Sequence, residues 1–149
     1  MSKIKKENGN FSDFSTPIVM GVLNVTTDSF YDGGKYLSEI EITKQIKKID
    51  DEGAKIIDVG ASSSRPGSIP VSEKTEINRL LPTIELIKKT SPNLKISIDT
   101  FRSNVAKECI KHGADIINDI SAGENDKKMF DTIAELNVPY VMMHMKGNT

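Results

Sequence analysis

The chain has 149 residues, of which 37% are hydrophobic and 28% are charged, and its formal net charge is -1. This composition is typical of one soluble globular domain; the near-neutral charge gives no general attraction to nucleic acid, and no apolar run reaches the roughly 20 residues of a membrane span. The single cysteine, Cys109, cannot form an internal disulfide, which favours a reducing, cytoplasmic location.

The first 16 residues carry lysines without a following apolar stretch, so we expect a solvated tail and not a signal peptide. From residue 17 to residue 149, five short runs rich in isoleucine and valine are separated by stretches with helical spacing. The runs do not alternate between apolar and polar residues, which predicts strands covered on both faces. The predicted strands lie at 17–24, 54–60, 94–99, 114–119 and 138–144.

Residues that favour helix ends frame the stretches between these strands. Gly53 and Gly113 are predicted to end the first and third helices, and Ser72 and Asp126 to cap the second and fourth. Pro82 lies inside the second helix and predicts a kink or a break there. Strand and helix in regular alternation predict a set of parallel βα units.

Polar side chains stand at or near the end of each predicted strand. They are Asn24, Asp58, Asp99, the pair Asn118 and Asp119, and His144. In parallel α/β folds the carboxyl ends of the strands share one face, where sites are built. Each residue could instead cap a helix or form a turn, and spacing alone names no reaction. The sequence therefore predicts a cluster of polar side chains at one end of the sheet, but it does not by itself indicate what this cluster does.

Two loops that follow predicted strands add further polar groups. One contains Asp32-Gly33-Gly34, and the other, from Ser62 to Gly67, contains Ser64 and Arg65. Loops of this composition can close over a substrate, and an arginine can pair with a phosphate or stack on a ring. A plain solvated turn is the alternative. Neither loop matches a Walker or dinucleotide glycine pattern.

Five blocks of sequence, in order, resemble the dihydropteroate synthases. The blocks are residues 21–34, 58–67, 97–100, 117–120 and 143–148. The family is a TIM (β/α)8 barrel, so the resemblance implies an α/β fold. About five parallel βα units over residues 17–149 make this an incomplete barrel, because a closed one needs about 250 residues and eight strands.

The resemblance implies a role in folate biosynthesis. The family condenses 6-hydroxymethyl-7,8-dihydropterin diphosphate with 4-aminobenzoate to give 7,8-dihydropteroate and pyrophosphate. It implies Mg²⁺ as the cofactor, with Asn24 holding the metal and the diphosphate, because Mg²⁺ takes oxygen ligands. These small molecules are the expected partners, together with a second copy of the full-length protein in a homodimer.

The resemblance also assigns individual residues. Asp99 and Asn118 would hydrogen-bond the pterin ring, and Ile120 and Met143 would pack against it. Ser64 stands at the position of a threonine that contacts substrate.

Catalysis is expected to involve Asp32, Arg65 and Asp99, through positioning and electrostatics and without a protein nucleophile. Asp32 and Arg65 would order the diphosphate and shape the aminobenzoate pocket.

The sequence departs from the family pattern at three places. Thr27 replaces a proline in the first loop, and Ser62 and Ser64 replace a glutamate and a threonine in the second. The third departure is that a later pterin-binding aspartate, a lysine, and a terminal arginine and histidine have no counterparts. We therefore expect a partial barrel with exposed inner apolar side chains and weak or absent activity alone. The alternatives are a non-catalytic pterin-diphosphate binding module and a pterin-dependent methyltransferase.

Overall fold

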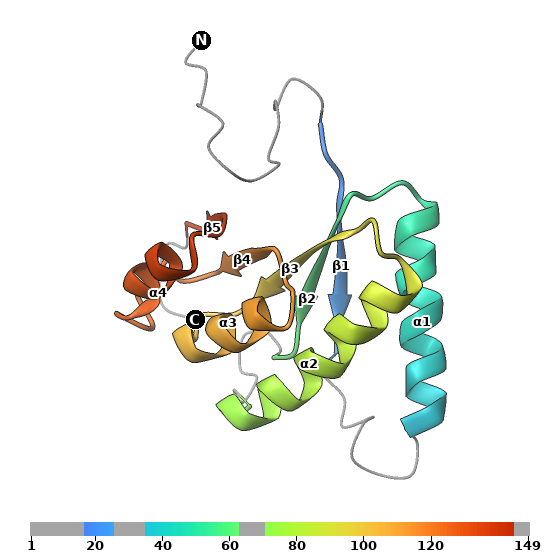
Figure 1. The fold of residues 1–149 in the computed structure, drawn as a ribbon, viewed down its shortest axis with the longest axis horizontal. Coiled ribbons are helices and arrows are strands. Elements are labelled where there is room, and N and C mark those ends of the chain that lie inside the picture. The colour runs from blue at the N-terminus through green and yellow to red at the C-terminus, as the bar shows by residue number, and fades with distance from the viewer. Residues whose placement is uncertain (1–16, 26–34, 63–70, 145–149) are drawn as a thin grey trace.

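The computed structural model describes residues 17–25, 35–62 and 71–144, in which strands and helices alternate (Figure 1). The elements are β1 (Met20–Asn24), α1 (Lys35–Asp51), β2 (Ile56–Gly60), α2 (Glu73–Thr90), β3 (Lys95–Asp99), α3 (Ser103–Lys111), β4 (Ile116–Asp119), α4 (Met129–Leu136) and β5 (Tyr140–Met142). Each predicted strand and helix is confirmed. The predicted tail at 1–16 lies outside the described residues.

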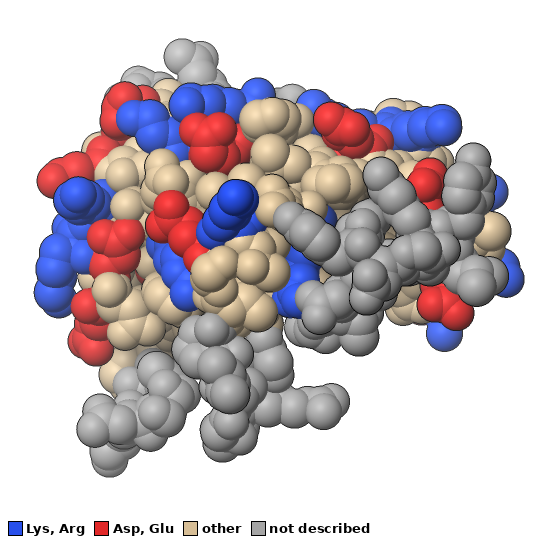
Figure 2. Space-filling model, turned by 90° about the horizontal axis from the view of Figure 1, so that it is seen from below, with Lys and Arg blue, Asp and Glu red and all other residues tan. Residues whose placement is uncertain are grey.

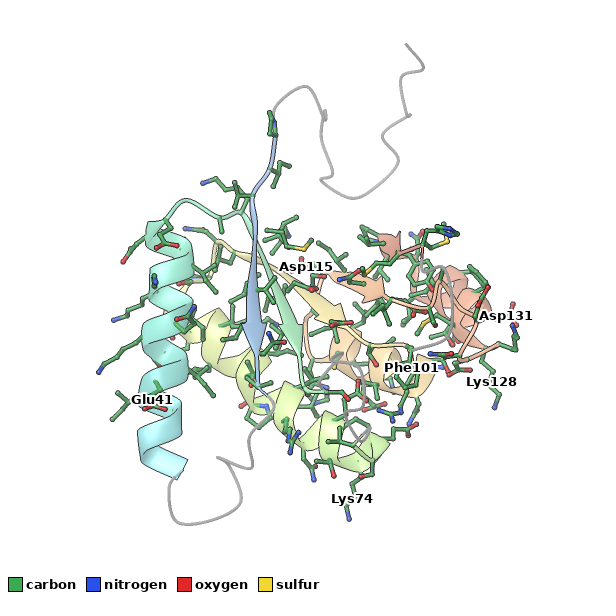
Figure 3. All side chains as sticks on the ribbon, turned by 180° about the vertical axis from the view of Figure 1, so that it is seen from behind. Glu41, Lys74, Phe101, Asp115, Lys128 and Asp131 are labelled. Atoms are coloured by element: carbon green, nitrogen blue, oxygen red, sulfur yellow. The ribbon has the colours of Figure 1, made fainter. Side chains whose placement is uncertain are left out.

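The five strands form one parallel sheet in the order β1-β2-β3-β4-β5. Right-handed crossovers between successive neighbouring strands put every connecting helix on the same face of the sheet. Helices α2 and α3 pass in front of the strands in Figure 1, and the strands stand in front of these helices in Figure 3. A doubly wound sheet would instead reverse its strand order and carry helices on both faces. The architecture is therefore a partial (β/α) barrel, as predicted.

The hydrophobic core lies between the sheet and this helix layer. One row of paired strand positions faces the helices and is almost fully buried: Leu23, Val59, Ile98 and Ile117. The helices contribute side chains with no exposed surface, Ile46 of α1 and Leu80, Ile84 and Ile87 of α2. Each such side chain contributes about 1.5–3 kcal/mol on burial. Packing against this helix layer holds the strands in place. It therefore also fixes the positions of the side chains at the strand ends.

The other face of the sheet, which would line the interior of a closed barrel, is partly open. Val22, Val141 and Met143 are on this side and are 58%, 41% and 44% exposed. The prediction of exposed inner apolar side chains is confirmed, whereas the prediction of strands covered on both faces is wrong for these positions. The apolar runs that suggested two covered faces are accounted for by a helix layer on one face and a barrel interior on the other.

Three of the predicted helix ends are confirmed. The Ser72 hydroxyl accepts a hydrogen bond from the Thr75 N–H at 3.1 Å and so caps α2. Gly53 and Gly113 follow α1 and α3 with φ of +90° and +97°. A side chain is strained in this left-handed region, so glycine is the residue that the turns require.

One of the predicted helix caps is wrong. Asp126 does not N-cap α4, whose N-cap position is Lys128. Its carboxylate instead accepts hydrogen bonds from the Ser103 N–H at the start of α3, at 2.8 Å, and from the Lys128 N–H, at 3.0 Å. At Pro82, where a kink or a break was predicted, the break does not occur, because helix α2 continues through this residue. Packing of α2 across the sheet outweighs the loss of one backbone hydrogen bond.

Charged side chains of both signs are interspersed on the face seen in Figure 2, without a large area of one sign. The labelled Lys74 in Figure 3 points away from the sheet into solvent. Within residues 17–25, 35–62 and 71–144, no helix has the length and apolar character of a membrane span.

Candidate active site

Three of the predicted site residues come from three different strands and meet in one row of the sheet. Asn24 of β1 pairs in register with Gly60 of β2, Gly60 with Asp99 of β3, and Asp99 with Asn118 of β4. Residues in register in parallel strands point to the same face. Their face is the one opposite the helices, at the carboxyl end of the strands. We call Asn24, Gly60, Asp99 and Asn118 the site row.

Gly60 leaves a gap in the middle of the site row. A β-carbon placed there would lie 3.3 Å from Asn24 Oδ1 and 3.3 Å from Asp99 Oδ2. The two side-chain oxygens therefore face the same small space from opposite sides. Because Gly60 has no side chain, a ligand can approach the backbone of β2 between them.

Asp99 is a carboxylate held in an unfavourable environment. Burial raises its pKa from 3.8 to about 6, and the negative charges of Asp58, Glu76 and Asp119 add to the shift. A carboxyl group perturbed in this way within a polar site marks a functional candidate. A ligand that brings N–H donors or positive charge to Asp99 would stabilise its ionised form.

Asn118 has one half of its amide hydrogen-bonded, and the other half has no partner among the described residues. Its Nδ2 donates a hydrogen bond to Asp58 Oδ2 at 3.0 Å. Its Oδ1 is buried and has no hydrogen-bond partner among the described residues. Leaving such an acceptor unpaired costs about 1–3 kcal/mol, so the geometry favours a ligand that donates to it.

Asp119, next to Asn118 in the chain, faces the opposite side of β4. Its buried carboxylate accepts hydrogen bonds from the Ser121 N–H at 2.8 Å, the Gly123 N–H at 2.9 Å and the Tyr140 hydroxyl at 2.7 Å. Asp119 therefore fixes the turn after β4 and the start of β5. For this residue the turn-forming alternative is the right one.

Ile120 and Met143 lie next to one another just past the ends of β4 and β5. Asp119 pairs in register with Met142, and the Met143 N–H donates to the Asp119 carbonyl at 3.1 Å. Ile120 is half-buried and Met143 is exposed. Ile120 lies two residues after Asn118, and Met143 lies two residues after Val141, the β5 residue in register with Asn118.

Asp32, Ser64, Arg65 and Thr27 lie outside the described residues. Two buried or half-buried arginines, which the sequence interpretation missed, hold the described residues on either side of 63–70. Arg79 of α2 donates to the Ala61 carbonyl at 2.9 Å.

Arg102, at the start of α3, donates to the Val71 carbonyl at 2.8 Å and forms an ion pair with the buried Glu76. The signal that could have found Arg79 is its helical spacing, which places it on the same buried face of α2 as Glu76 and Leu80.

The donor set at the site row fits a hard cation and not a transition metal. The described part of the chain contains no group of three or more His, Cys, Asp or Glu side chains suited to a metal. Mg²⁺ is commonly bound by one or two protein oxygens, with substrate phosphates and waters completing its octahedron. The side-chain oxygen of Asn24, beside the gap at Gly60, suits that arrangement.

Fold and site together define the class of protein. It is a partial (β/α) barrel with a row of polar side chains at the carboxyl ends of its strands. The family model described as "Pterin binding enzyme" matches residues 20–149. The chain belongs to this family of pterin-binding enzymes.

Relatives of known activity show the same similarity. The dihydropteroate synthase of Bacillus subtilis is 50% identical over 127 residues, covering 85% of this chain and 44% of that protein. A structure of the Xanthomonas albilineans dihydropteroate synthase with 4-aminobenzoic acid has a TM-score of 0.78 at 38% identity, covering 88% of this chain and 47% of that one. The Anaplasma phagocytophilum enzyme with bound 6-hydroxymethylpterin-monophosphate also has a TM-score of 0.78, at 35% identity, covering 86% and 49%.

This chain spans only part of the proteins that it resembles. It covers between 18% and 44% of the length of six curated relatives, all of them dihydropteroate synthases or folate synthesis proteins by name. The shared part contains the strands that carry the site row.

Proposed function

We propose that this chain is the pterin-binding, N-terminal part of a dihydropteroate synthase. That enzyme condenses 6-hydroxymethyl-7,8-dihydropterin diphosphate with 4-aminobenzoate to give 7,8-dihydropteroate and pyrophosphate. The observation that carries the proposal is the site row, which brings Asn24, Asp99 and Asn118 to one face of the sheet around the gap at Gly60. The bound 4-aminobenzoic acid and pterin monophosphate of the two similar structures support it.

Asp99 and Asn118 would recognise the edge of the pterin ring. At neutral pH a carboxylate with a pKa of about 6 is mostly ionised and accepts hydrogen bonds, and the buried Oδ1 of Asn118, unpaired among the described residues, is also an acceptor. The 2-amino group and ring N–H groups of a pterin are suitable donors. Ile120 and Met143, beside each other past the strand ends, would pack against the flat faces of the ring.

Asn24 would hold Mg²⁺ together with oxygens of the substrate diphosphate. When bound, the cation neutralises charge on the diphosphate and makes it a better leaving group. Asp32 and Arg65, outside the described residues, would order the diphosphate and shape the aminobenzoate pocket, and Ser64 would contact substrate.

The reaction is a substitution at the methylene carbon attached to the pterin ring. The C–O bond to the diphosphate breaks, the amine of 4-aminobenzoate forms a C–N bond to the same carbon, and the amine loses one proton. Positive charge that develops on the ring would be stabilised by the Asp99 carboxylate. The protein therefore acts by positioning and electrostatics, without a covalent intermediate.

The proposal is tested by calorimetry on the purified chain. We expect 6-hydroxymethyl-7,8-dihydropterin diphosphate to bind in the presence of Mg²⁺, and Asn24→Ala to remove the Mg²⁺ dependence while retaining binding of 6-hydroxymethylpterin. Asn104→Ala, on the exposed side of α3, is the matched control and should bind as the unchanged chain does. Absence of pterin binding, or binding of a methyl-folate in its place, would contradict the proposal.

Pyrophosphate release after addition of 4-aminobenzoate measures the catalytic part of the proposal. We expect release much slower than that of the Bacillus subtilis enzyme run in parallel, because this chain spans 44% of that protein. Pterin binding without any release would identify a binding module. A homodimer of the longer protein and a cytoplasmic location are further parts of the proposal; the latter is supported by the single cysteine.

A substitution at Gly60 tests the gap in the site row. Gly60→Ala should weaken binding of the pterin diphosphate about tenfold, because its methyl group would displace Asn24 and Asp99 by a few tenths of an ångström. The free energy of unfolding should change by less than about 1 kcal/mol. Gly21→Ala is the control: its methyl group would meet Ile49 of α1 at 2.5 Å, so it should destabilise the fold by about 1–3 kcal/mol. Unchanged pterin affinity in Gly60→Ala would contradict this interpretation of the gap.

A further inference from the structure

Asp58 is a buried carboxylate to which neither the fold nor the proposed reaction assigns a role. It lies in the middle of β2, two residues before Gly60 and on the same face, and is 6% exposed. One carboxylate oxygen accepts a hydrogen bond from Ser97 Oγ at 2.5 Å. The other accepts from Asn118 Nδ2 at 3.0 Å. Asp58 thus joins β2, β3 and β4 directly beneath the site row.

The charge of Asp58 determines which way the Asn118 amide points. An ionised carboxylate only accepts hydrogen bonds, whereas an asparagine amide has a donating and an accepting end. The donating end of Asn118 therefore turns toward Asp58, and its oxygen is turned away from Asp58. This oxygen is buried and has no hydrogen-bond partner within the described residues.

Ser97 engages the second oxygen of the Asp58 carboxylate. Its side chain has no exposed surface, and its hydroxyl donates to the oxygen that Asn118 does not use. With both oxygens engaged, the plane of the carboxylate is fixed between two neighbouring strands. A charge-assisted hydrogen bond of this kind is roughly twice as strong as a neutral one.

We propose that Asp58 is a positioning residue that fixes the Asn118 amide, so that its oxygen and not its NH₂ group faces the bound pterin ring. The ligand in this proposal rests on the proposed function, whereas the Asp58–Asn118 contact stands on the structure alone. Asn118 then accepts a hydrogen bond from the ring, and so selects a ring edge that carries an N–H donor. Loss of the charge on Asp58 would let the amide turn over and lose that selection.

Nuclear magnetic resonance on the ligand-free chain tests the contact. The side-chain amide of Asn118 can be assigned as the signal missing from Asn118→Asp. In Asp58→Asn its hydrogen exchange should become about tenfold faster, because a neutral hydrogen bond replaces a charge-assisted one. Ser97→Ala keeps the charge of Asp58 and should change this exchange rate by less than about threefold. An unchanged exchange rate in Asp58→Asn would overturn the proposal.

Binding of 6-hydroxymethylpterin tests the consequence. We expect Asp58→Asn to weaken binding about tenfold, since the ring then meets a mixture of amide orientations. Asn118→Asp alone should also weaken it, because it places two carboxylates side by side. The double variant Asp58→Asn with Asn118→Asp restores one charge to the pair and again presents an oxygen to the ring. It should recover binding to within about threefold of the unchanged chain.

The double variant separates positioning from a general structural effect. The proposal is wrong if circular dichroism shows that the double variant is folded and the double variant still binds 6-hydroxymethylpterin as weakly as Asp58→Asn alone. If the unchanged chain does not bind 6-hydroxymethylpterin, the proposed function fails, and the amide exchange measurement alone decides the role of Asp58.

Discussion

Arg102→Ala should destabilise the protein by about 3–5 kcal/mol, the largest effect that we expect from a single substitution. Arg102 forms an ion pair with Glu76, whose side chain is 2% exposed. Removal of the arginine would leave that carboxylate buried without its cation. The arginine also donates to the Val71 carbonyl at 2.8 Å, and its guanidinium lies 4.7 Å from the centre of the Phe101 ring. Urea denaturation of both proteins measures the difference.

An exposed ion pair on the same helix provides the control for this prediction. Lys107 Nζ lies 3.1 Å from a Glu135 carboxylate oxygen, and these side chains are 38% and 64% exposed. Lys107→Ala should therefore change the free energy of unfolding by at most about 1 kcal/mol. If Arg102→Ala and Lys107→Ala lower the free energy of unfolding equally, burial of Glu76 does not make its ion pair with Arg102 more stabilising than an exposed pair.

Asp99→Asn should make the ligand-free protein more stable at neutral pH while weakening pterin binding. The folded-state pKa of Asp99 is raised from 3.8 to about 6, chiefly by burial and then by Asp58, Glu76 and Asp119. Because the folded protein holds this proton more tightly than the unfolded chain, ionisation of Asp99 lowers stability. The penalty is absent below about pH 3.8, grows between 3.8 and 6, and is fully present above 6.

The expected gain for Asp99→Asn is about 1–2 kcal/mol at neutral pH, allowing for partial screening of this half-buried group by solvent. The gain should disappear as the pH falls to about 3.8. Urea denaturation at several pH values measures it, with the exposed Asp131→Asn as a control that should change stability by less than about 0.5 kcal/mol. If Asp99→Asn is less stable than the unchanged chain at neutral pH, ionisation of Asp99 does not destabilise the folded protein.

Much of the fold followed from the sequence because its signals are local. Apolar runs and helical spacing gave five strands and four helices, and capping residues such as Ser72 and Gly53 gave the helix ends. The site row was predicted only as a set of strand ends. Its register, which sets Asn24, Gly60, Asp99 and Asn118 side by side, depends on hydrogen-bond pairing between strands and has no local signal.

The remaining errors and omissions have the same cause, which is contact between distant parts of the chain. Asp126 stands three residues before α4 and resembles its cap, yet it bonds to Ser103, 23 residues away. The pairing of Arg102 with Glu76 spans 26 residues. Asn118 and Asp119 are equally polar neighbours, and only the pleat of β4, which turns them to opposite faces, separates the site residue from the turn residue.

A crystal structure of the chain with 6-hydroxymethylpterin tests the central claim most directly. The account predicts one ring beside the site row, within hydrogen-bond distance of the Asp99 carboxylate and donating a hydrogen bond to Asn118 Oδ1. A ring bound elsewhere, or side chains of Asn24, Asp99 and Asn118 directed to separate regions of the molecule, would contradict it.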